Sequence, residues 1–319
     1  MWAQRLAGPW RLEPVDVEPP KPEQLQDGQV ILKFRAAAIC GSDMPRFLGK
    51  VDPLQPWNGE PGFPLHEVVG EVVASKADNL APGDRVVGIA EGHRGLQEFF
   101  LNSARLVYRL NGSDLSDTEA TVIQPLGTVF NAIGRLPDVK GKRVAVIGLG
   151  PLGVLFCLAL KSRGAASVVG VDPIDRSDVA AAFGIDRQVI SVSGQWADAL
   201  HDAERPDVIV EAVGHQQGTL VDAIAAVAPL GHIFAFGVPD DAYYALPFRQ
   251  LFRKNATLHT GATTDWQRSL SESASFIHNN RGFLRAYVTN VLPTSRAEEA
   301  YRIYAQPKAG RLKVVLTPP

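Results

Sequence analysis

The first third of the chain alternates short apolar runs with turns that are rich in glycine, proline and aspartate. Four such runs are Val30–Ala38, Val68–Ala74, Arg85–Ala90 and Phe99–Tyr108. Short runs that contain many valines and phenylalanines and end at Pro-Gly or Gly-Asp clusters are typical of strands. The pattern predicts a mostly β region before about residue 120.

From about residue 124 the pattern changes to an apolar strand followed by a helix, repeated along the chain. The predicted strands are Arg143–Ile147, Ser167–Val171, Asp207–Val210 and His232–Phe236. The helix-compatible stretches between and after them are Leu152–Arg163, Asp178–Phe183, Gln195–Ala203 and Gly218–Ala228. Alternation of this kind predicts βαβ units and a parallel sheet that is covered by helices on both faces.

The last part of the chain carries two amphipathic stretches and a closing apolar strand, at 265–278, 295–304 and 312–316. We expect these elements to return to the first domain, so that the second domain is inserted between two parts of it. The prediction is an α/β protein with two domains. A mostly β domain takes residues 1–123 and 264–319, and a doubly wound parallel-sheet domain takes residues 124–263.

Composition narrows the classes of function. The chain has 319 residues, 45% of them hydrophobic, and a net charge of −2, which gives no reason to expect nucleic acid or a membrane surface as a partner. No apolar run approaches the roughly 20 residues that span a bilayer, and the N-terminus lacks the apolar core of a signal peptide. With only Cys40 and Cys157 present, a disulfide framework is excluded and a cytoplasmic location is expected.

The most informative motif is a glycine-rich turn between the strand at 143–147 and a helix. It reads Gly148-Leu149-Gly150-Pro151-Leu152-Gly153. In this pattern Gly148 permits a tight turn, Gly150 lets the backbone approach a pyrophosphate, and Gly153 allows the helix to pack closely on the strand. The phosphates would bind the free N–H groups of the helix N-terminus. The motif predicts a dinucleotide site, and the alternative is a related fold that binds another adenosyl ligand, such as a methyl donor.

An acidic residue after the second strand distinguishes between the two nicotinamide dinucleotides. Asp172 lies nineteen residues after Gly153. A carboxylate there accepts hydrogen bonds from the adenosine ribose and repels a 2′-phosphate. Arg176 is expected to pack along the adenine face, although an Arg near this position can also accept a phosphate. The sequence therefore predicts NAD.

A candidate zinc site before residue 125 is formed by Cys40, His66 and Gln124. Cys40 follows a strand, His66 precedes one, and Gln124 lies just ahead of the nucleotide domain. Thiolate and imidazole are the usual zinc ligands, a side-chain oxygen can complete the site, and a catalytic zinc keeps one position open for water or substrate. Each residue also has an ordinary structural explanation, as a packed Cys, a hydrogen-bonded His and a helix-capping Gln.

Taken together, several segments resemble the zinc-dependent medium-chain dehydrogenases/reductases of the alcohol dehydrogenase superfamily. They are Cys40–Asp43, Pro64–Gly70, Ala81–Val86, Gly148–Gly153, Glu211–Gly214 and Gly310–Leu316. The resemblance covers essentially the whole chain and is greatest to the polyol branch, which includes sorbitol, threonine and sugar-alcohol phosphate dehydrogenases. It implies a GroES-like catalytic domain and a Rossmann domain, with the active site in the cleft between them.

The resemblance also implies a set of metal ligands. Cys40 and His66 would bind zinc directly, and Glu67 would be an intermittent or indirect ligand. Gln124 would take the third position, where the branch commonly has a Glu-Pro-Leu segment. Because Gln124 is neutral, it binds metal more weakly than Glu and leaves the site one charge more positive.

Further roles follow from the same resemblance. Ser42 would hydrogen-bond the substrate oxygen and relay its proton, and Asp43 would orient the ring of His66. The loops that contain Val213-Gly214 and Gly237-Val238-Pro239 would flank the nicotinamide.

Two departures from the family pattern set expectations of their own. Residues 89–97 run through without the four cysteines of a structural zinc lobe, so one catalytic zinc is expected. Pro45 stands where many members have a His that relays protons. The proton would therefore leave by another route, through Ser42, a ribose hydroxyl and water.

The combined expectation is an NAD-dependent oxidoreductase that reversibly oxidises a secondary alcohol to a ketone. Zinc would act as a Lewis acid on the alcohol, and hydride would pass to the nicotinamide. A polar, partly aromatic pocket mouth would suit a polyol, cyclitol or sugar-like substrate. The residues expected at that mouth are Arg46, Phe47, Trp57, Ala90, Glu91 and His93.

Two other functions fit the same scaffold. One is a zinc-free medium-chain reductase that acts on a double bond or a quinone, although such enzymes generally lack both the Cys and the His. The other is a non-catalytic NAD(H)-binding protein, which Gln124 and Pro45 favour. In each case the expected partner is a small molecule, and a homodimer or homotetramer is expected from sheet pairing in relatives.

Overall fold

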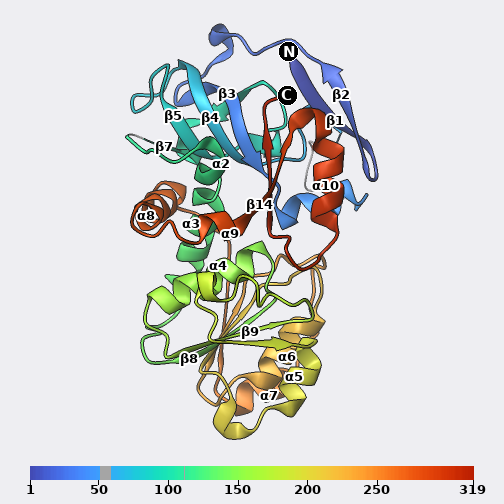
Figure 1. Cartoon of the computed structure of the whole chain (residues 1–319), viewed down its shortest axis with the longest axis vertical. Coiled ribbons are helices and arrows are strands. Elements are labelled where there is room, and N and C mark those ends of the chain that lie inside the picture. The colour runs from blue at the N-terminus through green and yellow to red at the C-terminus, as the bar shows by residue number, and fades with distance from the viewer. Residues whose placement is uncertain (51–58, 111) are drawn as a thin grey trace. The chain divides into compact units, whose positions relative to one another are not determined.

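The computed structural model describes residues 1–50, 59–110 and 112–319, which form two compact units (Figure 1). The terminal unit consists of Met1–Gly127, Asp265–Gln306 and Arg311–Pro319, and the inserted unit consists of Thr128–Thr264 and Pro307–Gly310. The sequence places the boundaries at 123/124 and 263/264, whereas the units change over at 127/128 and 264/265. The changeover at 127/128 falls inside helix α3 (Ile123–Ile133), which is why no turn marks it.

The terminal unit is built on a seven-stranded sheet in the described residues. Its main path runs β14 (Val288–Pro293), β15 (Lys313–Thr317), β3 (Gln29–Ala38), β4 (Glu67–Ser75), β5 (Arg85–Ile89) and β7 (Val107–Arg109), and β6 (Phe99–Ser103) pairs with β3. The pairs along this sheet are antiparallel except β14 with β15. A separate antiparallel pair is formed by β1 (Trp2–Gly8) and β2 (Arg11–Asp16).

One apolar core joins the sheet of the terminal unit to its helices. Helix α10 (Ala297–Ala305) buries Ala297, Ala300, Tyr301 and Tyr304, a spacing that puts one face of a helix against the sheet. The same core contains Phe34, Val68, Val86 and Val314 from four strands of the sheet. Full burial of one such side chain contributes about 1.5–3 kcal/mol. The terminal unit also contains three short helices, α1 (Met44–Phe47), α2 (Asp117–Ala120) and α9 (Leu284–Tyr287), and the longer amphipathic helix α8 (Trp266–Asn279).

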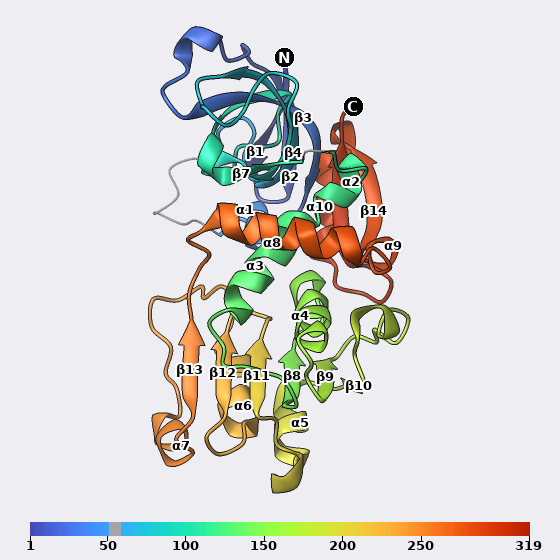
Figure 2. The ribbon, with the colours of Figure 1, turned by 90° about the vertical axis from the view of Figure 1, so that its left-hand side faces the viewer.

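The inserted unit has a six-stranded sheet in which the described pairs are all parallel (Figure 2). The strand order is β10 (Arg187–Ile190), β9 (Ser167–Asp172), β8 (Arg143–Ile147), β11 (Val208–Glu211), β12 (His232–Ala235) and β13 (Thr257–Thr260). The helices are α4 (Pro151–Ser162), α5 (Ser193–Ala199), α6 (Gly218–Ala226) and α7 (Phe248–Arg253). The first strand along the chain, β8, is central, and the order reverses between β8 and β11. This is the doubly wound arrangement, in which ligands bind at the carboxyl ends of the strands beside the reversal.

The predicted α/β fold, in which a mostly β domain carries an inserted doubly wound parallel-sheet domain, is confirmed. Two local predictions are wrong. The run 99–108 is not one strand, because a 3-10 turn at Ala104–Leu106 separates β6 from β7. The stretch 178–183 forms only a 3-10 turn at Ala181–Phe183, which ends at Gly184 in the left-handed conformation.

None of the helices in the described part of the chain combines the length and the apolar character that crossing a bilayer requires.

Candidate active site

Asp43 organises the segment that follows strand β3. Its side chain is fully buried, and one carboxylate oxygen, Oδ2, accepts a hydrogen bond of 2.9 Å from the backbone N–H of Cys40. The other oxygen, Oδ1, accepts a hydrogen bond of 2.8 Å from Nδ1 of His66. A carboxylate that receives the Nδ1 proton fixes the ring tautomer and leaves Nε2 as the nitrogen that can bind a metal. The structure therefore gives Asp43 the orienting contact that the resemblance implies.

The segment around His66 is held by backbone hydrogen bonds to a neighbouring turn. The carbonyl of His66 accepts a bond of 2.8 Å from the N–H of Ala90, and the N–H of Leu65 donates to the carbonyl of His93 across 2.8 Å. Glu67 then begins strand β4. These bonds hold the backbone of His66 in place, and the hydrogen bond to Asp43 orients its ring.

Cys40, His66 and Glu67 each offer one ligand atom, and these atoms lie within 4.8 Å of one another. The three residues are 9%, 7% and 1% exposed. A thiolate, an imidazole and a carboxylate that converge in a buried place are a donor set that suits zinc. Burial by itself lowers the pKa of His66, but Asp43 and Cys40 raise it well above its ordinary value. A metal ion would have to replace that proton.

The carboxylate of Glu67 is bound by a lysine that the sequence reasoning missed. Nζ of Lys313, in strand β15, lies 2.5 Å from Oε2 of Glu67, and both side chains are 1% exposed. Burial raises the pKa of Glu67, and the charges of Lys313 and His66 oppose that rise. The segment Gly310–Leu316 was a signal for the family, but nothing in it indicates which residue Lys313 contacts.

A second histidine lies against the first. The ring centroids of His66 and His93 are 4.5 Å apart, and Nδ1 of His93 lies 3.8 Å from Oδ1 of Asp43. Burial lowers the pKa of His93 to about 4, and nearby His66 and Arg46 add to the effect while Asp43 opposes it. Asp43, His66 and His93 form a second set of ligand atoms within 4.8 Å. His93 thus lies against the ring of His66, a contact that the sequence did not predict, and its expected place at the pocket mouth stays a prediction.

The other residues expected at the pocket mouth do not all lie there. Phe47 is fully buried and packs against the rings of Trp10 and Tyr301, so the prediction is wrong for this residue. Ala90 is also fully buried. In both cases an apolar side chain beside the site is used by the core. Trp57 lies outside the described residues.

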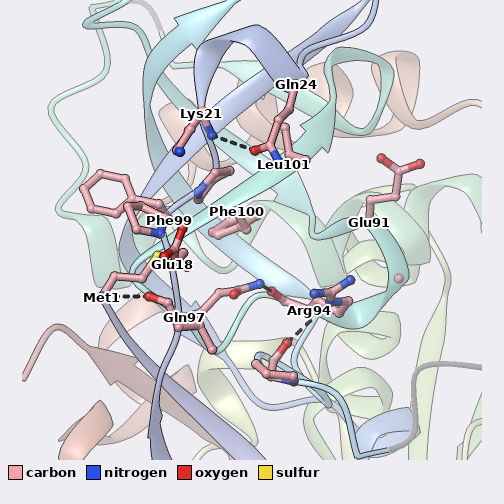
Figure 3. A pocket seen from close by; sticks show the side chains of 15 residues that line it. Met1, Glu18, Lys21, Gln24, Glu91, Arg94, Gln97, Phe99, Phe100 and Leu101 are labelled. Atoms are coloured by element: carbon pink, nitrogen blue, oxygen red, sulfur yellow. Dashed lines mark hydrogen bonds between the residues drawn. The ribbon is translucent and has the colours of Figure 1, made fainter.

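Glu91 lines a different cavity of the terminal unit. This cavity has a volume of about 580 Å³ and is bounded by the loop that carries Lys21 and Gln24 and by Phe99 and Leu101 of β6 (Figure 3). None of Cys40, His66 and Asp43 borders it. Glu91 therefore borders this cavity, whereas His93, in the same turn, contacts the ring of His66.

Three tyrosines from the C-terminal part of the terminal unit lie near the metal-ligating set. Burial raises the pKa of Tyr287, Tyr301 and Tyr304 well above its ordinary value, and the nearby charge of Glu67 adds to the rise in each case. The hydroxyl of Tyr301 donates a hydrogen bond to the carbonyl of Pro64. The amphipathic spacing of α10 predicted only burial for these residues, because the periodicity of a helix does not indicate what it covers.

The structure gives the local environment of Ser42 and Gln124, which the sequence did not predict. Ser42 is half-buried in the 3-10 turn Gly41–Asp43, directly after Cys40. Gln124 is 4% exposed and is the second residue of helix α3. Their roles in proton relay and metal binding stay predictions.

In the inserted unit the glycine-rich turn requires glycine for steric reasons. Gly148 has φ of +90°, and a Cβ there would lie 2.6 Å from a side-chain atom of Val213. A Cβ on Gly153 would lie 1.8 Å from the carbonyl oxygen of Gly148. A Cβ on Gly150, which precedes helix α4, would meet no atom within 4 Å. Gly148 and Gly153 therefore serve the packing of the turn, whereas the space over Gly150 is open to a ligand.

Asp172 ends strand β9 and is tied to the same turn. Its Oδ2 accepts a hydrogen bond of 2.6 Å from the N–H of Leu149, and its Oδ1 accepts one of 2.8 Å from the N–H of Ile174. Arg176 is 2% exposed and donates from Nη1 to the carbonyl of Lys308 across 2.8 Å. The guanidinium is thus anchored to the loop Pro307–Gly310, and its expected contact with an adenine stays a prediction.

The loops after β11 and β12 are shaped by one buried carboxylate and two glycines. Oε1 of Glu211 accepts hydrogen bonds from the N–H groups of Val213 and Gly214 and from the hydroxyl of Thr219. A Cβ on Gly237 would lie 2.1 Å from the backbone nitrogen of Gly214. The two loops therefore pack backbone to backbone at the carboxyl edge of the sheet, the same edge at which the turn after β8 lies.

Two domain families match different segments of this chain. The family described as zinc-binding dehydrogenase matches residues 151–278, and the alcohol dehydrogenase GroES-like domain matches residues 26–106. Together these segments span nearly two thirds of the chain. The chain belongs to the medium-chain dehydrogenases of the alcohol dehydrogenase superfamily. The resemblance inferred from the sequence is confirmed, and the protein is an alcohol dehydrogenase-type oxidoreductase.

Individual relatives of this dehydrogenase are distant but extensive. L-arabinitol 4-dehydrogenase from Aspergillus oryzae is 26% identical over 92% of this chain and 87% of its own length. Sorbitol dehydrogenase from Ovis aries is 27% identical over 67% of this chain and 72% of its own. The solved structure of alcohol dehydrogenase TADH from Thermus sp. ATN1 covers 100% of both chains with a TM-score of 0.82 and 24% identity, which supports the fold alone.

Proposed function

We propose that this dehydrogenase uses NAD and one catalytic zinc to oxidise a secondary alcohol of a polyol, cyclitol or sugar-like substrate reversibly to a ketone. The observation that carries the proposal is the convergence of Cys40 and His66, beside the carboxylate of Glu67, in a buried site whose imidazole is oriented by Asp43. The curated relatives named above act on arabinitol and sorbitol, which supports a substrate with several hydroxyl groups.

The residues present fit a zinc ion. Cys40 and His66 would hold it, with Gln124 as the proposed third protein ligand. When bound, zinc supplies Lewis acid chemistry that lowers the pKa of the substrate hydroxyl. Lys313 holds Glu67 through a buried ion pair, so this carboxylate would bind metal only when the pair opens.

The protein's own groups would move the proton and exclude water. Ser42 lies two residues after Cys40, in the 3-10 turn that Cys40 precedes, and is proposed to accept the proton of the substrate hydroxyl. Asp43 is engaged by both Cys40 and His66 and therefore positions ligands rather than taking the proton. Tyr301 and Phe47 fill the space beside the site and keep that side apolar.

The inserted unit would bind the cofactor at the carboxyl edge of its sheet. The proposed phosphate contacts are the N–H groups around Gly150, and the adenosine ribose would bond to Asp172. The nicotinamide would lie on the loops that carry Val213-Gly214 and Gly237-Val238-Pro239. Arg176 would border the adenine.

The main test is a substrate screen combined with metal analysis. Polyols, aminocyclitols and sugar alcohols are each supplied with NAD or NADP, and reduction is followed at the absorbance of the reduced nicotinamide. We expect turnover with NAD, one zinc per chain, and loss of turnover after chelation. Full activity without zinc would instead favour a zinc-free reductase.

A substitution at the metal site distinguishes an enzyme from a binding protein. Cys40→Ala should abolish turnover while NADH binding, followed by fluorescence, is retained. Cys157→Ala is the matched control, because Cys157 is a fully buried residue of helix α4 and is not among the proposed metal ligands. NADH binding by the wild-type protein without turnover of any alcohol would support the non-catalytic alternative.

We also propose a homodimer or homotetramer that forms through the edge strand β13. Phe248 and Phe252 on the adjoining helix α7 are 70% and 73% exposed, and apolar side chains beside an open strand edge favour pairing with a second copy. Analytical ultracentrifugation of the wild type and of a Phe248→Glu variant tests this, and a monomeric wild type would contradict it.

A further inference from the structure

The loops that follow β11 and β12 are joined by a side-chain bond as well as by their backbones. Nδ1 of His215 lies 2.6 Å from Oδ1 of Asp240, and the backbone N–H of His215 donates to the carbonyl of Val238 across 2.7 Å. The two side chains keep 31% and 24% of their area exposed, so the pair is partly shielded from water. A hydrogen bond to a charged group in such a place contributes more than a fully exposed ion pair.

The backbone at His215 is in a conformation that favours another residue type. Its φ is +56°, in the left-handed region that glycine or asparagine adopts more easily than histidine. Non-glycine residues persist there when the surroundings hold them, and they are concentrated at ligand-binding and catalytic sites. The contacts of His215 with Val238 and Asp240 supply that restraint.

The strands that these loops follow indicate which end of a bound dinucleotide would lie near the pair of His215 and Asp240. Strands β11 and β12 lie on one side of β8, whereas β9, which ends at Asp172, lies on the other. The adenosine end is expected at Asp172, so the loops after β11 and β12 would face the nicotinamide end. Val213 and Val238 on these loops are 37% and 50% exposed, which gives the nicotinamide ring an apolar surface to lie on.

We propose that His215 and Asp240 form a latch that sets the spacing of the two loops and so positions the nicotinamide. This inference rests on the proposed function of the inserted unit as an NAD site. His215 and Asp240 are positioning residues, since they act through the backbones that carry Val213 and Val238. Opening the latch would let the loops separate, and the nicotinamide half of the cofactor would lose its fixed surface while the adenosine half would not.

The test compares two ligands that differ only in the nicotinamide. NADH binding is followed by nicotinamide fluorescence, and ADP-ribose binding by calorimetry, for the wild type, His215→Asn and Asp240→Asn. Asn tolerates the left-handed backbone at position 215 but is too short to reach Asp240, and Asp240→Asn removes the charge from the other loop. We expect each variant to bind NADH about 5- to 10-fold more weakly and ADP-ribose within about twofold of the wild type.

A double variant and a matched control complete the design. His215→Asn/Asp240→Asn should weaken NADH binding no more than the stronger single variant, because both substitutions break one bond. Lys161→Gln breaks a 2.8 Å ion pair with Asp186 in the same unit and should change neither affinity. Equal weakening of NADH and ADP-ribose, or no change in either, would overturn the latch. A wild-type protein that binds neither ligand would overturn the proposed function, and the latch with it.

Discussion

At the scale of single residues, the proposed zinc ligands Cys40 and His66 are both held by one carboxylate that is not itself a proposed ligand. Asp43 receives the N–H of Cys40 on one oxygen and Nδ1 of His66 on the other, so one buried side chain fixes both proposed zinc ligands. The sequence suggested half of this arrangement, because the resemblance implied that Asp43 orients His66. The bond to the backbone of Cys40 does not follow from the sequence, since it depends on the tight 3-10 turn after β3.

Substitution of Asp43 should therefore weaken zinc binding without removing a ligand. Asp43→Asn keeps the size of the side chain but loses the charge that fixes the His66 tautomer, and such changes typically cost about 10- to 100-fold in metal affinity. Zinc affinity is measured by competition with a chromophoric chelator. Asp84→Asn, which changes a half-buried loop acid of the same unit that pairs with Arg109, is the control and should leave the affinity unchanged. Unaltered zinc affinity in Asp43→Asn would contradict the orienting role.

Cofactor preference is a second property that resides in one residue. Asp172 does more than the sequence indicated, since its Oδ2 also holds the N–H of Leu149 in the glycine-rich turn. Asp172→Asn keeps an acceptor for that bond and removes the charge that would repel a 2′-phosphate. We expect the ratio of NADP to NAD activity to rise by about 10-fold or more, because a close like charge is removed. An unchanged ratio would show that Asp172 does not contact the ribose.

At the scale of elements, the glycines of the turn between β8 and α4 have separable purposes. Gly148 permits the turn beside Val213, Gly153 allows the helix to approach the turn, and Gly150 leaves space for a ligand. The close contacts at Gly148 and Gly153 agree with the steric roles that the sequence predicted, because those roles depend on a local backbone path that the strand-turn-helix pattern already specifies. The approach of a pyrophosphate to Gly150 stays a prediction. The structure adds the distances that make the roles testable.

Alanine at two of these positions should give opposite phenotypes. Gly153→Ala would place a Cβ 1.8 Å from the carbonyl oxygen of Gly148, so the helix must shift, and overpacking of this kind costs typically about 1–3 kcal/mol of unfolding free energy. Gly150→Ala meets no neighbouring atom and should keep its stability but bind NADH more weakly. Urea denaturation and NADH titration separate the two effects, and equal stability losses would contradict this assignment.

At the scale of the whole molecule, the reactivities of the two cysteines should report on two different processes, metal binding and unfolding. Cys40 is 9% exposed and belongs to the proposed metal site, whereas Cys157 is fully buried in helix α4 of the inserted unit. Burial raises the pKa of the Cys157 thiol far above its ordinary value, and only the thiolate reacts readily. The reactivity of one thiol should therefore follow metal binding, and that of the other should follow unfolding.

Titration of the thiols with an aromatic disulfide reagent measures the reactivity of Cys40 and of Cys157. In zinc-free native protein we expect one thiol to react, and added zinc should protect it. The second thiol should react only in denaturant, at the concentration at which far-UV circular dichroism reports unfolding of the inserted unit. Cys40→Ala identifies the reactive thiol, and rapid labelling of two thiols in the native zinc-free protein would contradict the burial of Cys157.

The sequence by itself determined the two-domain α/β fold, the glycine-rich turn, and the candidates Cys40, His66 and Asp172. These features depend on periodicity and on short motifs, in which the residues that interact are neighbours along the chain. The tertiary structure alone decided that Lys313 pairs with Glu67, that His93 lies on His66, and that Tyr301 donates to Pro64 across 237 residues. In those cases the partners come from segments that only the folded chain brings together. A pattern such as the amphipathic face of α10 predicts that a side chain is buried, whereas the partner depends on how the C-terminal segment packs on the sheet.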